Sequence, residues 1–346
     1  MIDSSQDRRN VLRRSAGTIW HQRVQQPWPE DRPFRILSID GGGIRGIYPA
    51  KFLAEIERRH QAEGSIGRYF DLITGTSTGG IIALGLGYGL SAGDISQLYL
   101  DEGDKIFPVD SFPVRVLRSA KQWVRSAYGS GPLNEQLENI FGGALLGDTK
   151  TRLCIPAFEG VHAEPWVYKT PHHPDYENDQ HELLVNVALA TSAAPTFLPA
   201  LQNNGYTMVD GGLLANNPIM VGAIDALACY QLSRRQVQVL SIGCGGSGFR
   251  VSHKMRRGGL WQWKKAISAS IDAVSHNILG QARLLLGADN ILRVDLPDSI
   301  KPIGLSDFQR ARNELPQIAE MKAVDLFPEV AERFLVSPTN YKPITI

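Results

Sequence analysis

The stretch from Phe70 to Gly80 reads FDLITGTSTGG, and the rest of the chain is interpreted around it. Its apolar first half ends in the turn Gly75–Gly79, which fits Gly-x-Ser-x-Gly, and apolar residues resume at Ile81. A strand that turns sharply into a helix around this motif is typical of a nucleophile elbow. Glycine tolerates the strained backbone of such a turn, and the first N–H groups of the helix point toward developing negative charge. Ser77 is therefore a candidate nucleophile, although an ordinary turn rich in Gly, Ser and Thr also fits the motif alone.

The composition limits the kind of protein that this chain can form. It has 346 residues, of which 43% are hydrophobic, which is enough for a sizeable core. The net charge of +1 gives no global attraction to a nucleic acid polymer. Three widely separated cysteines predict neither a disulfide framework nor a Cys-x-x-Cys metal pair. No window of about 18 uncharged apolar residues predicts a transmembrane helix, and the Arg8-Arg9 pair lacks the apolar region of a secretion signal, so we expect a cytoplasmic protein.

Segments typical of strands alternate with segments typical of helices along the whole chain, ending in a helix expected near 306–326. The strand candidates are 34–39, 70–73, 153–158, 166–169, 206–209, 237–242 and 291–295. Such alternation is typical of a mostly parallel sheet that is covered by helices on both faces, so the sequence predicts an α/β fold. We expect an N-terminal arm over 1–33, a catalytic core over 34–245, and a C-terminal part over 246–346 that packs on the core within a single domain.

A second glycine-rich turn, Asp40–Gly46, has the sequence DGGGIRG and follows a predicted strand. It matches the Gly-x-Gly-x-x-Gly fingerprint of dinucleotide-binding folds at Gly41, Gly43 and Gly46. Consecutive glycines also suit an oxyanion loop, in which bare N–H groups converge on one point. The fingerprint needs an acidic residue at the end of a second strand, but the acidic residues nearest to that position fall in a predicted helix. The oxyanion loop is therefore favoured, and an NAD-type oxidoreductase is the alternative.

A third motif, Met208–Gly212, has the sequence MVDGG and places Asp210 directly after a predicted strand. A serine is a weak nucleophile without a base, and a carboxylate at this sheet edge would serve Ser77. An Asp-Gly turn without chemical function also fits this motif alone. No histidine has a context that indicates a catalytic base, and those considered are His172, His173, His181, His253 and His276. A Ser-Asp dyad is therefore the preferred hypothesis.

These three motifs, in this order, resemble the patatin-like phospholipase family. Two further segments, 190–196 and 216–218, look like segments of that family, so the resemblance covers roughly residues 34 to 245. It implies a three-layer α/β/α patatin-like fold with a mostly parallel central sheet, and a lipid acyl hydrolase of the phospholipase A type. By this resemblance Ser77 is the nucleophile and Asp210 is its base in a reaction that passes through an acyl-enzyme. The expected oxyanion residues are Gly41, Gly42, Gly43, Arg45 and Thr78, and neither a metal nor a cofactor is expected.

The chain is also similar to the phospholipase effectors of bacterial anti-phage systems, which a cyclic dinucleotide switches on to degrade the cell's own membrane. This resemblance implies a cyclic dinucleotide activator, a membrane phospholipid substrate at the inner face of the membrane, and a homo-oligomer. An unregulated general esterase is the alternative. Two segments, 112–128 and 247–265, combine basic and apolar residues, and a solvated basic face explains them equally well. Their candidates for membrane or nucleotide contacts are Arg115, Arg118, Lys121, Arg125, Lys254, Arg256 and Arg257.

Overall fold

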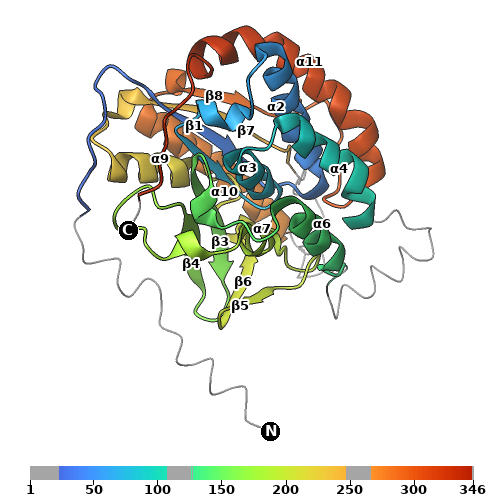
Figure 1. Cartoon of the computed structure of the whole chain (residues 1–346). Coiled ribbons are helices and arrows are strands. Elements are labelled where there is room, and N and C mark those ends of the chain that lie inside the picture. Colours follow the sequence, from blue (N-terminus) through green and yellow to red (C-terminus); the bar gives the residue numbers. More distant parts are fainter. Residues whose placement is uncertain (1–22, 107–125, 127, 247–265, 345–346) are drawn as a thin grey trace, which may run out of the picture.

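The computed structural model describes residues 23–106, 126, 128–246 and 266–344 (Figure 1). Several residues singled out from the sequence lie outside these ranges. They are His253 and all seven basic candidates, Arg115, Arg118, Lys121, Arg125, Lys254, Arg256 and Arg257.

One mixed sheet, with eight strands among the described residues, runs through the centre of the molecule (Figure 1). Five strands run parallel, in the order β3 (Arg152–Glu159), β2 (Leu72–Gly75), β1 (Phe34–Ile39), β7 (Val237–Ile242) and β8 (Ile291–Val294). Three strands are antiparallel to their neighbours, namely β4 (Glu164–Lys169), β5 (Leu201–Asn203) and β6 (Tyr206–Asp210). All six residues of β1 are buried, as expected for a central strand of a sheet that is covered on both faces.

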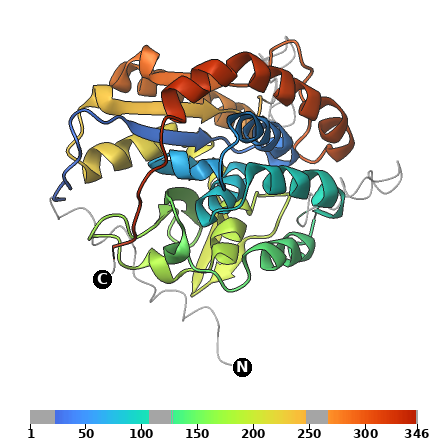
Figure 2. The same cartoon turned by 45° about the horizontal axis from the view of Figure 1, so that its top comes forward.

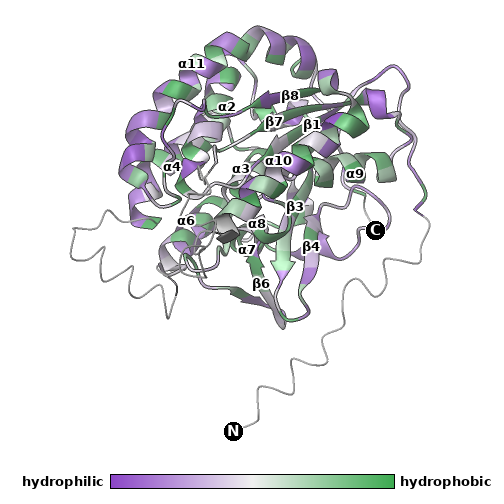
Figure 3. Cartoon of the chain, turned by 180° about the vertical axis from the view of Figure 1, so that it is seen from behind, coloured by the Kyte–Doolittle hydropathy of each residue, from purple (hydrophilic) through white to green (hydrophobic). Residues whose placement is uncertain are grey.

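Helices cover both faces of the sheet, because side chains of successive strand residues point to opposite faces. Leu37 and Ile39 of β1 belong to one apolar core, whereas Phe34 and Ile36 belong to the other. The first core is covered by α2 (Ile47–His60), α3 (Thr78–Tyr88), α4 (Ala92–Ile106), α6 (Gly131–Phe141), α7 (Leu184–Ser192) and α11 (Phe308–Phe334). The second is covered by α9 (Ile219–Cys229) and α10 (Ala266–Leu286). Figure 3, which shows the molecule from the opposite side to Figure 1, has these two helices on the near face of the sheet. The three-layer α/β/α prediction is therefore confirmed.

Strand β8 and helices α10 and α11 follow β7 in the chain, and they extend the same sheet and pack on its two cores. Strand β8 pairs with β7 in parallel, with Val239 opposite Ile291. Helix α11 lies along the outer side of α2 (Figure 2). It extends to Phe334, beyond the expected end near residue 326, although it contains Pro316 and Pro328. A proline removes one backbone hydrogen bond from a helix, and the apolar stripe that α11 buries offsets this loss.

Strand β2 begins at Leu72, two residues later than the predicted start at Phe70. The buried carboxylate of Asp71 accepts the backbone N–H of Arg35 at 2.9 Å, and the strand begins after this contact. No helix of the described residues is both long and apolar enough to cross a lipid bilayer.

Candidate active site

The turn between β2 and α3 has the geometry of a nucleophile elbow. Ser77 precedes the first residue of α3 and has φ 56° and ψ −123°, in a region that residues with a side chain rarely adopt. The turn is too tight for a larger residue at Gly75, because a Cβ there would lie 2.1 Å from the carbonyl oxygen of Gly79. The serine is thereby held at the carboxyl end of the sheet with its side chain free of the helix.

Asp210, at the end of β6, meets Ser77 although the two residues are far apart in the chain. The Ser77 Oγ donates a hydrogen bond of 2.7 Å to Asp210 Oδ2. The other carboxylate oxygen, Oδ1, accepts the N–H of Gly212 at 2.6 Å. Both side chains are largely buried, with 9% of Ser77 and 6% of Asp210 exposed. The pair is therefore oriented for direct proton transfer, with no histidine between the two groups.

The environment of Asp210 adjusts its basicity. Burial raises the pKa of Asp210 to about 6, against the opposing effect of the hydrogen bonds from Ser77 and Gly212, which favour the charged form. A carboxyl group with this pKa is still mostly ionised at neutral pH, and it holds a proton more tightly than an ordinary aspartate does. This is the balance that a general base requires.

Two polar groups that the sequence did not single out support the site, one at the elbow and one at the glycine loop. The N–H of Ser77 donates to Thr191 Oγ1 at 3.0 Å, and the Thr191 hydroxyl donates to the Pro156 carbonyl at 2.6 Å. Asn216 accepts the N–H of Gly41 on its backbone carbonyl at 2.9 Å. Both residues lie in the segments 190–196 and 216–218, whose likeness to the family was the one available signal of their importance.

The glycine loop lies beside the nucleophile, but its glycines differ in what they offer. A Cβ on Gly41 would lie 3.3 Å from the Cβ of Ser77, so Gly41 permits close approach. Its N–H already donates to the Asn216 carbonyl, so the predicted oxyanion role of Gly41 requires that bond to be given up. The N–H groups of Gly42 and Gly43 donate to no described residue.

The backbone N–H of Thr78 likewise has no acceptor among the described residues, as expected at the first position of a helix. Three N–H groups, those of Gly42, Gly43 and Thr78, thus have no acceptor among the described residues. Whether they converge on a substrate oxygen stays a prediction.

Arg45 supports the loop from behind. Its Nε donates to the Gly42 carbonyl at 3.2 Å, and its Nη1 donates to the carbonyls of Gly245 and Gly246 at 2.8 and 3.1 Å. In a trans peptide the C=O and the following N–H point in opposite directions. By holding the Gly42 carbonyl, Arg45 therefore directs the N–H of Gly43 the opposite way, and its own guanidinium is already occupied by backbone oxygens.

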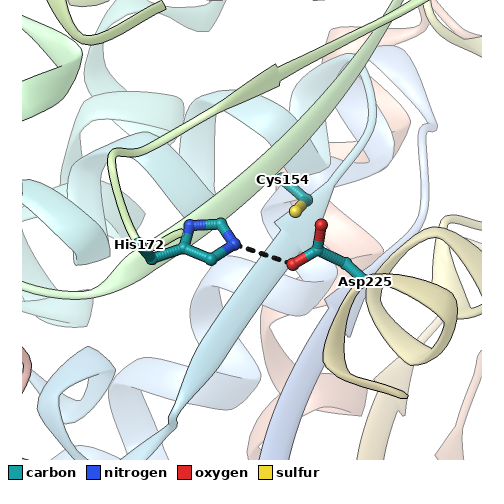
Figure 4. Close-up of side chains that lie close together, drawn as sticks. All are labelled: Cys154, His172 and Asp225. Carbon is teal, nitrogen blue, oxygen red and sulfur yellow. Dashed lines mark hydrogen bonds and ion pairs between the residues drawn. The ribbon is translucent and has the colours of Figure 1, made fainter. Parts of the chain in front are cut away.

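A second buried polar cluster lies away from the dyad and contains His172, one of the histidines considered above. Cys154, His172 and Asp225 each present a potential metal ligand, and these ligand atoms lie within 4.8 Å of one another (Figure 4). His172 Nε2 is 2.7 Å from Asp225 Oδ2. The other oxygen of Asp225 accepts from Lys169 Nζ at 2.7 Å and from the Tyr176 hydroxyl at 2.6 Å.

Burial by itself raises the pKa of Asp225, but the charges of His172 and Lys169 and their hydrogen bonds hold that pKa below its ordinary range. A cation at this position would have to displace the ammonium group of Lys169. The cluster is therefore a satisfied polar network that joins β4, α9 and the loop after β4, and we assign no metal to it. No sequence pattern indicated this cluster, because its members come from distant segments of the chain.

Three more of the histidines considered as a catalytic base lie in the described residues. His173 is buried and its Nε2 lies 2.9 Å from the Val24 carbonyl oxygen. His276 is exposed on α10, and His181 ends a short turn of 3₁₀ helix. None of them is hydrogen-bonded to Ser77.

Comparisons with known proteins point to one family. A family described as patatin-like phospholipase matches residues 37–223. A cGAMP-activated phospholipase of Escherichia coli is 39% identical over 235 residues, which cover 64% of this chain and 65% of the relative. A cGAMP-activated phospholipase of Pseudomonas aeruginosa is 35% identical over 287 residues, which cover 79% of this chain and 82% of the relative.

Among solved structures, VipD of Legionella pneumophila is similar with a TM-score of 0.43 and 14% identity, over 87% of this chain and 67% of that one. That likeness is too weak to carry a conclusion. The resemblance drawn from the three motifs is confirmed by the family match and by the named relatives. The chain belongs to the patatin-like phospholipase family.

Proposed function

We propose that the protein is a lipid acyl hydrolase of the phospholipase A type, in which Ser77 is the nucleophile and Asp210 is its base. The observation that carries this proposal is the 2.7 Å hydrogen bond from Ser77 Oγ to Asp210 Oδ2 at a strained strand-to-helix turn. Family membership supports the reaction class, because a hydrolase of this kind needs an activated serine.

The proposed reaction has two halves, with an acyl-enzyme between them. Asp210 accepts the hydroxyl proton as Ser77 Oγ attacks the ester carbonyl, and the resulting oxyanion is stabilised by the N–H groups of Gly42, Gly43 and Thr78. Asp210 then gives the proton to the departing lysolipid oxygen, which leaves an acyl-enzyme. A water molecule is deprotonated by Asp210 and attacks the acyl group, so that the fatty acid is released and Ser77 recovers its proton. Every proton that leaves an attacking oxygen is returned to a leaving oxygen.

We also propose a membrane phospholipid substrate, reached at the inner face of the membrane, and activation by a cyclic dinucleotide in anti-phage defence. The support is the similarity to two relatives named cGAMP-activated phospholipases. A homo-oligomeric active form is part of the same proposal. The residues that would bind the nucleotide are not assigned, and the basic candidates in segments 112–128 and 247–265 lie outside the described residues.

The test is release of fatty acid from phospholipid vesicles, measured with and without a panel of cyclic dinucleotides. We expect hydrolysis that rises at least about tenfold with one member of the panel and is lost in Ser77→Ala. Equal hydrolysis with and without every nucleotide would leave an unregulated esterase and refute the activation step.

An NAD-type oxidoreductase, the alternative that the glycine fingerprint suggested, gives no role to the bond between Ser77 and Asp210. A fluorophosphonate probe separates the two activities. Labelling of the wild-type chain that disappears in Ser77→Ala supports the hydrolase, whereas no labelling under any condition argues against it.

A further inference from the structure

The glycine loop begins with a buried carboxylate that has a partner from the far end of the chain. Asp40, directly after β1, is 4% exposed. Arg293 of β8 donates to both of its oxygens, from Nη1 to Oδ1 at 3.1 Å and from Nη2 to Oδ2 at 2.6 Å. A two-pronged pair of this kind fixes direction as well as distance. The loop is therefore anchored at its first residue by a strand that is two positions away in the sheet.

The Arg293 guanidinium contacts residues at the carboxyl ends of three neighbouring strands, β1, β7 and β8. Arg293 lies opposite Ser241 of β7 and donates to its hydroxyl at 2.8 Å. It also pairs with Asp295, just after the end of β8. There is no room for a side chain beside this pair, because a Cβ on Gly243 would lie 2.1 Å from Asp295 Oδ2 and 2.3 Å from Arg293 Nη2. One side chain thus ties the carboxyl ends of β1, β7 and β8 together.

The contacts then continue back to the glycine loop and close a ring. Asp295 Oδ1 accepts the N–H of Gly245 at 2.9 Å. The Gly245 carbonyl accepts from Arg45, and Arg45 holds the Gly42 carbonyl, as described above. The loop is consequently held at two points. Asp40 contacts Arg293 directly, and the Gly42 carbonyl is linked to Arg293 through Arg45, Gly245 and Asp295.

The charges of the ring balance. Two carboxylates, Asp40 and Asp295, are matched by two guanidinium groups, Arg45 and Arg293. Burial raises the pKa of Asp40 to about 6 although Arg293 and, more weakly, His276 favour its charged form, while the neighbouring Asp295 opposes them. Removing Arg293 would leave a buried carboxylate without its main partner, which is far more costly than losing an exposed ion pair.

We infer that Arg293 is a positioning residue, which acts through Asp40 and Asp295 to hold the N–H groups of Gly42 and Gly43 in place for the oxyanion. This inference rests on the proposed acyl hydrolase function and deepens it. Arg293 lies outside residues 37–223 that the family match covers. The final part of the chain therefore completes the site rather than merely covering it.

The test compares Arg293→Met with a matched control at the other end of β1. Arg35 is likewise buried and faces a buried carboxylate, with its Nε 3.8 Å from Asp71 Oδ2. We expect kcat to fall about 10- to 100-fold in Arg293→Met with KM within about threefold, since the loss of one oxyanion donor costs about 100-fold or more. Arg35→Met should lower the melting temperature to a similar extent and leave kcat within about threefold of wild type. Arg293→Lys keeps the charge but loses the bidentate contact with Asp40, so its kcat should lie between those of wild type and Arg293→Met.

A second readout does not depend on activity. The N–H groups of Gly41, Ile44 and Arg45 are hydrogen-bonded in the loop. Their amide hydrogen exchange should be faster in Arg293→Met than in wild type, and unchanged in Arg35→Met. If Arg293→Met does not fold, Arg293→Lys and Asp40→Asn allow the same comparison.

A double-mutant cycle tests the route through Asp40. If Arg293 acts through Asp40, the kcat of Asp40→Asn/Arg293→Met should be no lower than that of Arg293→Met alone. The inference is overturned by losses in kcat that multiply in the double variant, by equal losses in Arg293→Met and Arg35→Met, or by unchanged exchange of the loop amides. Absence of hydrolysis that requires Ser77 in the wild type would refute the proposed function instead, and the exchange comparison would still decide the role of Arg293.

Discussion

Replacing Asp210 with asparagine removes the proton acceptor of Ser77 while changing the size of the side chain very little. In the wild type, one carboxylate oxygen accepts the serine proton at 2.7 Å and the other accepts the Gly212 N–H at 2.6 Å. An asparagine can keep the second bond with its carbonyl oxygen, so the fold should persist. Its amide nitrogen is a donor and has no place for a proton. The substitution therefore isolates the chemistry of the base.

The expected size of the effect follows from the role of the base. A positioned general base contributes about 100- to 10,000-fold, so we expect kcat to fall about 1,000-fold, or about 4 kcal/mol of barrier. The wild-type pH profile gives an independent value. Because Asp210 must be ionised and burial raises its pKa to about 6, kcat/KM should fall as the pH drops through about 6. Titration of one group with that pKa predicts kcat/KM about tenfold lower at pH 5 than at pH 7.

The assay is initial-rate hydrolysis of a soluble fluorogenic ester across pH 5 to 8, with vesicles as the second substrate. Asp40 also has a pKa raised to about 6, so Asp40→Asn is the necessary control, and its profile should keep the same acid limb. Two results would refute the reasoning. One is an Asp210→Asn enzyme within tenfold of wild type. The other is an acid limb that disappears in Asp40→Asn or in a histidine variant.

Three further predictions concern stability and the loop. Folding raises the pKa of Asp210 from 3.8 to about 6, which destabilises the native state by about 3 kcal/mol at most once the pH exceeds both values. Asp210→Asn should therefore have a higher melting temperature than wild type at pH 8, and the difference should vanish below pH 4. Gly42→Ala should reduce kcat at least about tenfold, because its Cβ would lie 2.4 Å from the Cβ of Cys244, while Gly131→Ala, with open space at the Cβ position, should match wild type. Asp225→Ala leaves Lys169 and His172 buried without their acceptor, so it should lower the free energy of unfolding in urea by about 3–5 kcal/mol and leave kcat unchanged. A loss of kcat in the folded variant would contradict the structural role assigned to Asp225.

The elements that the sequence predicted well are those whose signal is local. The turn around Ser77 could be recognised because one short run contains the end of a strand, the glycines and the start of a helix. The α/β class was predicted in the same way, because short apolar runs typical of strands alternate along the chain with segments that have the apolar spacing of helices. The end of α11 was missed, because its last turns are stabilised by the burial of Val330 and of Phe334, which stacks on Phe70, and not by their own sequence, which includes Pro328.

Local sequence patterns were enough to predict the strand–turn–helix around Ser77, the glycine loop after β1 and the carboxylate after β6. Each is a backbone requirement met by adjacent residues. The three-dimensional arrangement was needed to show which donors of the loop are free, because the acceptor of the Gly41 N–H is the carbonyl of Asn216. It also revealed the anchor of the loop, since Arg293 joins Asp40 across β7. A hydrogen bond between residues so far apart in the chain depends on strand order and register, which no local pattern records.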